Sequence, residues 1–106
     1  MYLSVRKYRV DPDRMDELMH RVDETFAPRL EAMDGFVAYQ VFDAGSGILY
    51  STTCCHDEDA VEQSVALASA FVREDLADFD IERLEVAFGE IGVSRARSEV
   101  LEPAHA

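Results

Sequence analysis

The side chains best suited to hold a small molecule in this chain are Arg6, Tyr39 and Tyr50. Arg6 stands in the middle of an expected strand, where a charged group needs water, an ion-pair partner or an anionic ligand. We expect solvation or an ion pair there, with the anionic ligand as the alternative. Tyr39 and Tyr50 belong to an expected hairpin, and their hydroxyls could position a phenol or a quinone in a cavity. Simple aromatic packing in the core is the competing interpretation.

The segment Cys54-Cys55-His56-Asp57 has the residue types of a metal site but not the spacing. Consecutive strand residues point to opposite sides of a sheet, so these four cannot all converge on one ion. We therefore expect two reduced thiols and no metal. His56 is a candidate general base or axial ligand just before a helix, with an exposed loop histidine as the alternative.

Motifs that bind a nucleotide or activate a nucleophile are absent from the sequence. There is no nucleophile elbow, no phosphate-binding glycine loop and no dinucleotide fingerprint, so we expect no cofactor. His20 lies between the apolar positions of a helix and His105 lies near the chain end, so neither is a catalytic candidate. Ser64 is interpreted as a small packing residue.

The first half of the chain predicts a strand and then a long helix. Residues 2–10 mix apolar and polar positions as a strand does, and Asp11-Pro12 is a typical helix start. Apolar residues then recur every three or four positions for about twenty residues. Pro28 is expected to bend or split this helix near Phe26, and Gly35 ends it.

The second half predicts a hairpin, a helix and a last strand. The hairpin pairs residues 36–42 with 48–55, and the segment 56–59 opens the second helix. The apolar arc of that helix, which includes Phe71, is wide enough to contact a cleft ligand, the tail or a second subunit besides the sheet. The last strand changes its alternation, for which we expect a bulge near Gly89.

This order of elements predicts an α+β, ferredoxin-like βαββαβ sandwich, in which two helices cover one face of a four-stranded antiparallel sheet. We expect one domain over residues 1–95 and a C-terminal tail over 96–106. The strands carry apolar residues on both faces, and two helices can cover only one face. The sequence therefore predicts a homodimer that pairs through the other face.

Composition limits the partners. Twenty-two acidic residues against ten basic ones give a formal charge of −12, so we expect neither nucleic acid nor an anionic membrane surface as a partner. The sequence shows neither a membrane-spanning stretch nor a secretion signal, and a cytoplasmic location is expected.

Several short segments resemble the antibiotic biosynthesis monooxygenase-like domains of the dimeric α/β-barrel superfamily. The likeness covers roughly residues 1–95 and rests on caps and turns: Tyr8-Arg9-Val10-Asp11-Pro12, Phe26-Ala27-Pro28, Gly35-Phe36, Asp57-Glu58-Asp59-Ala60-Val61-Glu62-Gln63-Ser64 and Gly89-Glu90-Ile91. The resemblance implies a dimeric barrel with a ligand site between sheet and helices. The superfamily includes quinone-forming monooxygenases without cofactors and haem-degrading oxygenases. Their Asn and Trp residues have no counterpart, because this chain contains neither type.

Two hypotheses of function follow from the resemblance and the residues. The first is a cofactor-independent, monooxygenase-like protein that binds a small apolar or aromatic, quinol-type substrate in the helix–sheet cleft. Its ligand-cleft candidates are Arg6, Tyr39, Tyr50, His56 and Phe71. The second is a non-catalytic dimeric module that binds a small ligand or serves as an accessory protein. Haem binding through His56 is a third, weaker alternative.

Overall fold

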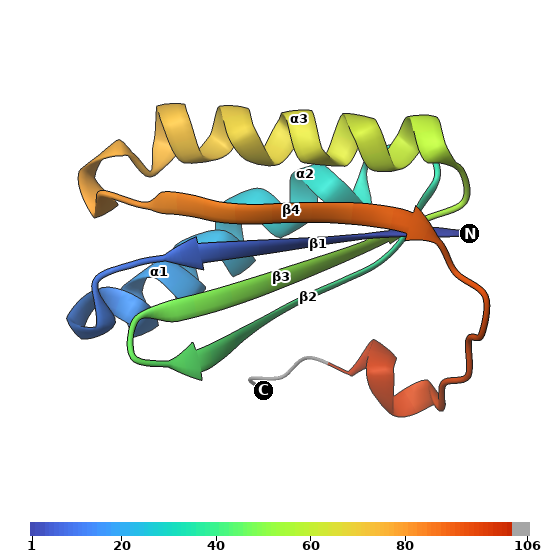
Figure 1. Cartoon of the computed structure of the whole chain (residues 1–106), viewed down its shortest axis with the longest axis horizontal. Coiled ribbons are helices and arrows are strands. Elements are labelled where there is room, and N and C mark those ends of the chain that lie inside the picture. The colour runs from blue at the N-terminus through green and yellow to red at the C-terminus, as the bar shows by residue number, and fades with distance from the viewer. Residues whose placement is uncertain (103–106) are drawn as a thin grey trace.

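The structure, a computed structural model, describes residues 1–102 and contains one antiparallel sheet with helices on one side (Figure 1). The strands are β1 (Tyr2–Arg9), β2 (Phe36–Gly45), β3 (Ile48–Cys55) and β4 (Glu82–Glu90). The helices are α1 (Met15–Arg21), α2 (Ala27–Glu31) and α3 (Glu58–Asp75), with short helical turns η1 (Pro12–Arg14), η2 (Val22–Phe26), η3 (Ala77–Phe79) and η4 (Ser98–Leu101). The strand order β2-β3-β1-β4 confirms the predicted ferredoxin-like fold.

The helix-covered face of the sheet carries the core. Along β1 and β3 every second side chain is buried, which places Tyr8 and Leu49 under the helices. The main core cluster joins these strands to α1, α2 and α3: it contains Tyr8, Val10, Met15, Leu18, Phe26, Leu30, Leu49, Ala68, Phe71, Leu76 and Phe79.

Local signals set the helix starts as expected, whereas the first helical segment ends at Glu31, four residues before Gly35. The Asp11 carboxylate accepts a hydrogen bond from the Asp13 amide at 2.9 Å, and Asp57 caps α3 by accepting from the Ala60 amide at 2.8 Å. The predicted break near Phe26 is confirmed, because a wider, π-helical turn, η2, separates α1 from α2 immediately before Pro28.

Two strand irregularities change the pattern of side chains on the sheet. The register between β2 and β3 shifts between Phe36 and Ala38, so Phe36 packs against the core on the same side as Tyr39. In β4 the shift lies around Leu84, opposite Lys7 and Tyr8, and not near Gly89, where the sequence suggested it. Each extra residue changes which side chains of its strand face the helices.

The other face of the sheet has no covering element among residues 1–102. It carries apolar side chains: Leu3 and Val5 on β1 are partly exposed, and Phe42 is 51% exposed and stacks on Tyr50 with ring centroids 5.2 Å apart. Lys7 extends over the Tyr50 ring at 5.8 Å. We refer to these five side chains as the open face.

After β4 and the partly buried Ile91, the chain is exposed from Gly92 through residue 102. In Figure 1 it leaves the sheet at the end where the N-terminus lies, and η4 sits on the side away from α3. The expected tail, residues 96–106, falls in this segment, and its last four residues, including His105, lie outside the described part of the chain. Within residues 1–102 no helix has the length and apolarity needed to cross a membrane.

Gly35 provides a test of the packing between the turn before β2 and the start of α3. Gly35 and Gly45 both have a positive φ, +84° and +86°, but only at Gly35 would an added Cβ come within 2.9 Å of another side chain, at Ala60. Gly45→Ala should cost about 1 kcal/mol of unfolding free energy from backbone strain alone. Gly35→Ala should cost about 2–4 kcal/mol, because overpacking is added. Urea unfolding measures both, and equal losses would contradict the close approach.

Candidate functional site

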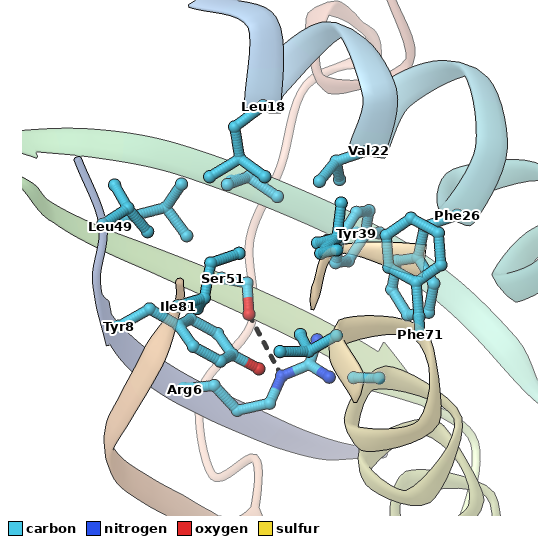
Figure 2. Close-up of a pocket in the computed structure, with 15 residues that line it drawn as sticks. Arg6, Tyr8, Leu18, Val22, Phe26, Tyr39, Leu49, Ser51, Phe71 and Ile81 are labelled. Carbon is cyan, nitrogen blue, oxygen red and sulfur yellow. Dashed lines mark hydrogen bonds between the residues drawn. The ribbon is translucent and has the colours of Figure 1, made fainter. Parts of the chain in front are cut away.

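A largely apolar cavity of about 40 Å³ lies between the sheet and the helices (Figure 2). Aromatic side chains form one wall, where the Phe26 ring stacks on Phe71 with centroids 4.8 Å apart and meets the edge of Tyr39 at 5.7 Å. Aliphatic side chains form much of the remaining wall, among them Leu18 on α1, Leu49 on β3 and Ile81 before β4.

Arg6 is the charged residue in the cavity wall. Its side chain is 1% exposed, and it reaches across the helix-facing side of the sheet. Its Nε donates to Ser51 Oγ at 3.0 Å, its Nη2 donates to Thr53 Oγ1 at 3.0 Å, and its Nη1 makes a longer bond to the Ser64 carbonyl at 3.5 Å. All of these partners are neutral.

Strand register explains this arrangement. Arg6 is paired with Ser51 across the β1–β3 ladder, and Thr53 is two residues further along the same face. No ion pair involves Arg6 among residues 1–102, so the expectation of a solvated or salt-bridged arginine is not met. A buried cation with neutral partners keeps a strong electrostatic preference for an anion.

Two phenol groups accompany the guanidinium. Tyr8, 6% exposed, lies two residues from Arg6 on the same face, and its hydroxyl points toward the Arg6 side chain (Figure 2). Burial raises the pKa of Tyr39 well above its ordinary value, with Arg6 opposing and Tyr8 reinforcing the shift. Tyr39 is therefore a neutral hydrogen-bond donor at physiological pH.

A second, wider space adjoins the cavity. A groove of about 260 Å³ is lined by Tyr8, Ser69, Val72, Arg73, Ile81 and Arg83. Tyr8, Val72 and Ile81 line both spaces, so the groove and the cavity have a wall in common. We refer to the cavity of about 40 Å³ as the inner cavity and to the groove of about 260 Å³ as the outer groove.

The structure brings three of the five sequence-predicted candidates together. Arg6, Tyr39 and Phe71 line the inner cavity. Tyr50 belongs to the open face on the opposite side of the sheet, and His56 is exposed in the turn before α3, so neither lines the cavity.

Sequence reasoning missed Tyr8, Ser51 and Thr53 as members of the site. The alternation of β1 and β3 was the available signal, because residues two apart on a strand share a face. What the sequence did not indicate is which of the two faces the helices cover.

The cysteines are placed for packing rather than reaction. Both are free thiols, Cys55 is buried, and Cys54 faces the other side of the sheet. Burial raises the pKa of both thiols, which favours the protonated, weakly nucleophilic form. Within residues 1–102 no group of three or more His, Cys, Asp or Glu side chains is arranged to hold a metal ion.

Comparison with solved structures shows the same fold at low sequence identity. A candidate antibiotic biosynthesis monooxygenase from Deinococcus radiodurans is similar with a TM-score of 0.71 and 17% identity, over 92% of this chain and 98% of that one. A monooxygenase from the gene ActVA-Orf6 of Streptomyces coelicolor, in complex with nanaomycin D, is similar with a TM-score of 0.68 and 16% identity, over 92% of each chain. A dimeric ferredoxin-like protein from an uncultured marine organism has a TM-score of 0.69 and 11% identity, over 91% and 98%.

No family model matches the chain, and no curated protein matches it. The likeness therefore concerns the backbone and extends over nearly the whole of the described chain. As the short sequence resemblance implied, the fold of this chain is that of the antibiotic biosynthesis monooxygenase-like ferredoxin-fold proteins.

Proposed function

We propose that the inner cavity binds the hydroxyl-bearing edge of a small aromatic molecule as its phenolate, and that the protein is a monooxygenase-like oxidase of such compounds without a cofactor. The observation that carries this proposal is the buried Arg6 guanidinium, which faces an apolar cavity and has only neutral partners. An anionic oxygen placed beside it would gain a full charge–charge interaction at low dielectric.

The dimensions of the site support a ligand that occupies both spaces. The inner cavity of about 40 Å³ is smaller than an aromatic ring, whereas the adjoining groove of about 260 Å³ is large enough for one. The phenolic oxygen would lie near Arg6 and Tyr39, and the remainder of the ligand would extend past Tyr8 into the groove.

The chemistry that this arrangement favours is oxidation of an electron-rich phenolate by O₂. For an activated ring methylene, two C–H bonds break, one oxygen atom enters a new carbonyl group, and the other leaves as water with the two hydrogens. The substrate supplies all four electrons. Arg6 would hold the phenolate, and the protonated Tyr39 would donate a hydrogen bond to the developing oxygen anion.

A second candidate function, a module that binds the same ligand without turnover, is favoured by a specific observation. Neither space has a carboxylate or a histidine in its lining, so the described residues offer no general base there. The exposed position of His56, outside the cavity, gives the haem alternative no support.

Binding of a nitrophenol tests the site directly, because its phenolate absorbs in the visible. At a pH one unit below the pKa of the free compound, the wild-type protein should increase the phenolate band, since Arg6 lowers the pKa of bound phenol by about 1–2 units. Arg6→Gln should abolish the increase, and Arg97→Gln, at an exposed position, should retain it. Circular dichroism checks that both variants are folded. A wild-type protein that binds nitrophenol in its neutral form would contradict the proposal.

Oxygen uptake separates the enzyme from the binding module. Under the enzyme proposal, a panel of hydroquinones and anthrone-type phenols should include compounds that consume one O₂ per molecule oxidised, and Arg6→Gln should lower the rate at least tenfold. Product analysis in ¹⁸O₂ should find one labelled oxygen in the product. Phenolate binding without O₂ consumption above background across the panel would favour the module.

We also propose that the open face is covered by a second copy of the chain. Its apolar side chains have no covering element in residues 1–102, and a solved structure with the same fold is described as dimeric. Face-to-face packing of two such sheets by a two-fold axis would remove this surface from water.

The dimer proposal predicts a specific disruption. Val5→Arg places a charge in the middle of the open face and should weaken self-association at least tenfold, whereas Val93→Arg, at a position 86% exposed after β4, should not. Sedimentation velocity over a micromolar concentration series measures the effect. A compact wild-type monomer at all concentrations would contradict the proposal.

A further inference from the structure

The outer groove is positively charged although the protein is strongly acidic. Two of its six lining residues, Arg73 and Arg83, are cationic, and none is acidic. The whole chain has more than twice as many acidic as basic residues, with a net charge of −12. The groove is therefore a local exception to the charge of the molecule, and it adjoins the cavity that contains Arg6.

Arg83 is oriented by a hydrogen bond, and its positive charge is not neutralised by an ion pair within the described chain. Its Nη1 donates to Ser69 Oγ on α3 at 2.7 Å, and no ion pair involves Arg83 among residues 1–102. The neutral hydroxyl orients the guanidinium and leaves its charge available to a ligand. Arg73 is partly satisfied, because its Nη2 lies 3.7 Å from the exposed carboxylate of Glu74.

Arg83 and Arg6 are both neighbours of one tyrosine on the same face of the sheet. Tyr8 is paired with Arg83 across the β1–β4 ladder and follows Arg6 by two residues on β1, a rise of about 6.6 Å. Two arginines without carboxylate partners in the described chain thus adjoin Tyr8, one lining the buried cavity and one lining the open groove. A ligand that occupies both spaces would therefore reach from the guanidinium of Arg6 to that of Arg83.

We propose that the ligand is an aromatic acid, whose carboxylate binds Arg83 in the outer groove while its phenolic oxygen lies beside Arg6. The inference rests on the proposed function and adds the class of the substrate. The fork of the Arg83 guanidinium matches a carboxylate. Arg83 has no ion-pair partner among the described residues, whereas Arg73 already interacts with Glu74. The groove therefore suits a singly charged group better than a dianionic phosphate. The apolar Val72 and Ile81 would contact the ring or the chain between the two groups.

The test compares 3-(4-hydroxyphenyl)propionate with its methyl ester by isothermal titration calorimetry. The two compounds have the same ring and phenol, and only the acid carries the charge. The wild-type protein should bind the acid about three- to tenfold more tightly than the ester, the range expected for an exposed charge-assisted contact. Raising the salt concentration should reduce this preference, because the groove is open to solvent.

Variants test whether Arg83 causes the preference for the acid over the ester. Arg83→Gln should remove the preference for the acid and leave the affinity for the ester within about twofold. Arg95→Gln, which removes the same charge at an exposed position outside both spaces, should keep the preference. Ser69→Ala, which removes only the group that orients Arg83, should reduce the preference in part. Because Arg83 is exposed and Ser69 is partly exposed, these variants should remain folded.

The outcomes distinguish this inference from the proposed function. Equal affinities for acid and ester in the wild-type protein would overturn the inference and leave the phenolate site standing. A preference for the acid that persists in Arg83→Gln would also overturn it. Failure of the protein to bind either compound, or a nitrophenol, would overturn the phenolate site itself and the inference with it.

Discussion

Burial of one guanidinium group is the constraint on which the site depends. Moving a charge out of water is costly unless other groups replace the lost solvation, and here two hydroxyls and a carbonyl do so for Arg6. Those partners come from β3 and α3, so the charge ties the middle of the sheet to the helix above it. Because the partners are neutral, the positive charge of Arg6 is not compensated, and it acts on whatever group occupies the cavity.

Charge is distributed unevenly along the path from solvent to this cation. The surface as a whole repels anions at long range, yet the groove that adjoins the cavity is lined with cationic and apolar residues. At physiological ionic strength the repulsion is screened beyond about 8 Å, so the local groups decide what binds. A small molecule with limited charge is compatible with both features, whereas a polyanion such as nucleic acid is not.

Element order and helix starts were predictable from the sequence, because they depend on local chemistry. Pro28 marked the interruption of the first helix, as the structure confirms, whereas the helical segment ends at Glu31, four residues before Gly35, where the sequence placed its end. The orientation of side chains across the sheet was less predictable, since it depends on bulges and on which face the helices cover. The extra residues near Val37 and Leu84 leave no distinctive sequence signal. For this reason Arg6, Tyr39 and Phe71 were recognised together, while Tyr8 was missed and Tyr50 falls on the far side.

The π-helical turn η2 bears on how the inner cavity could accommodate a ligand larger than its volume in this structure. Two of its five residues, Val22 and Phe26, are cavity walls, and they stand where the main-chain hydrogen bonding of the first helix is already irregular. Conversion between π and α spacing moves side chains by a fraction of a turn without unwinding the helix. Expansion of the inner cavity would therefore need the least rearrangement at η2, while the sheet keeps its hydrogen bonds.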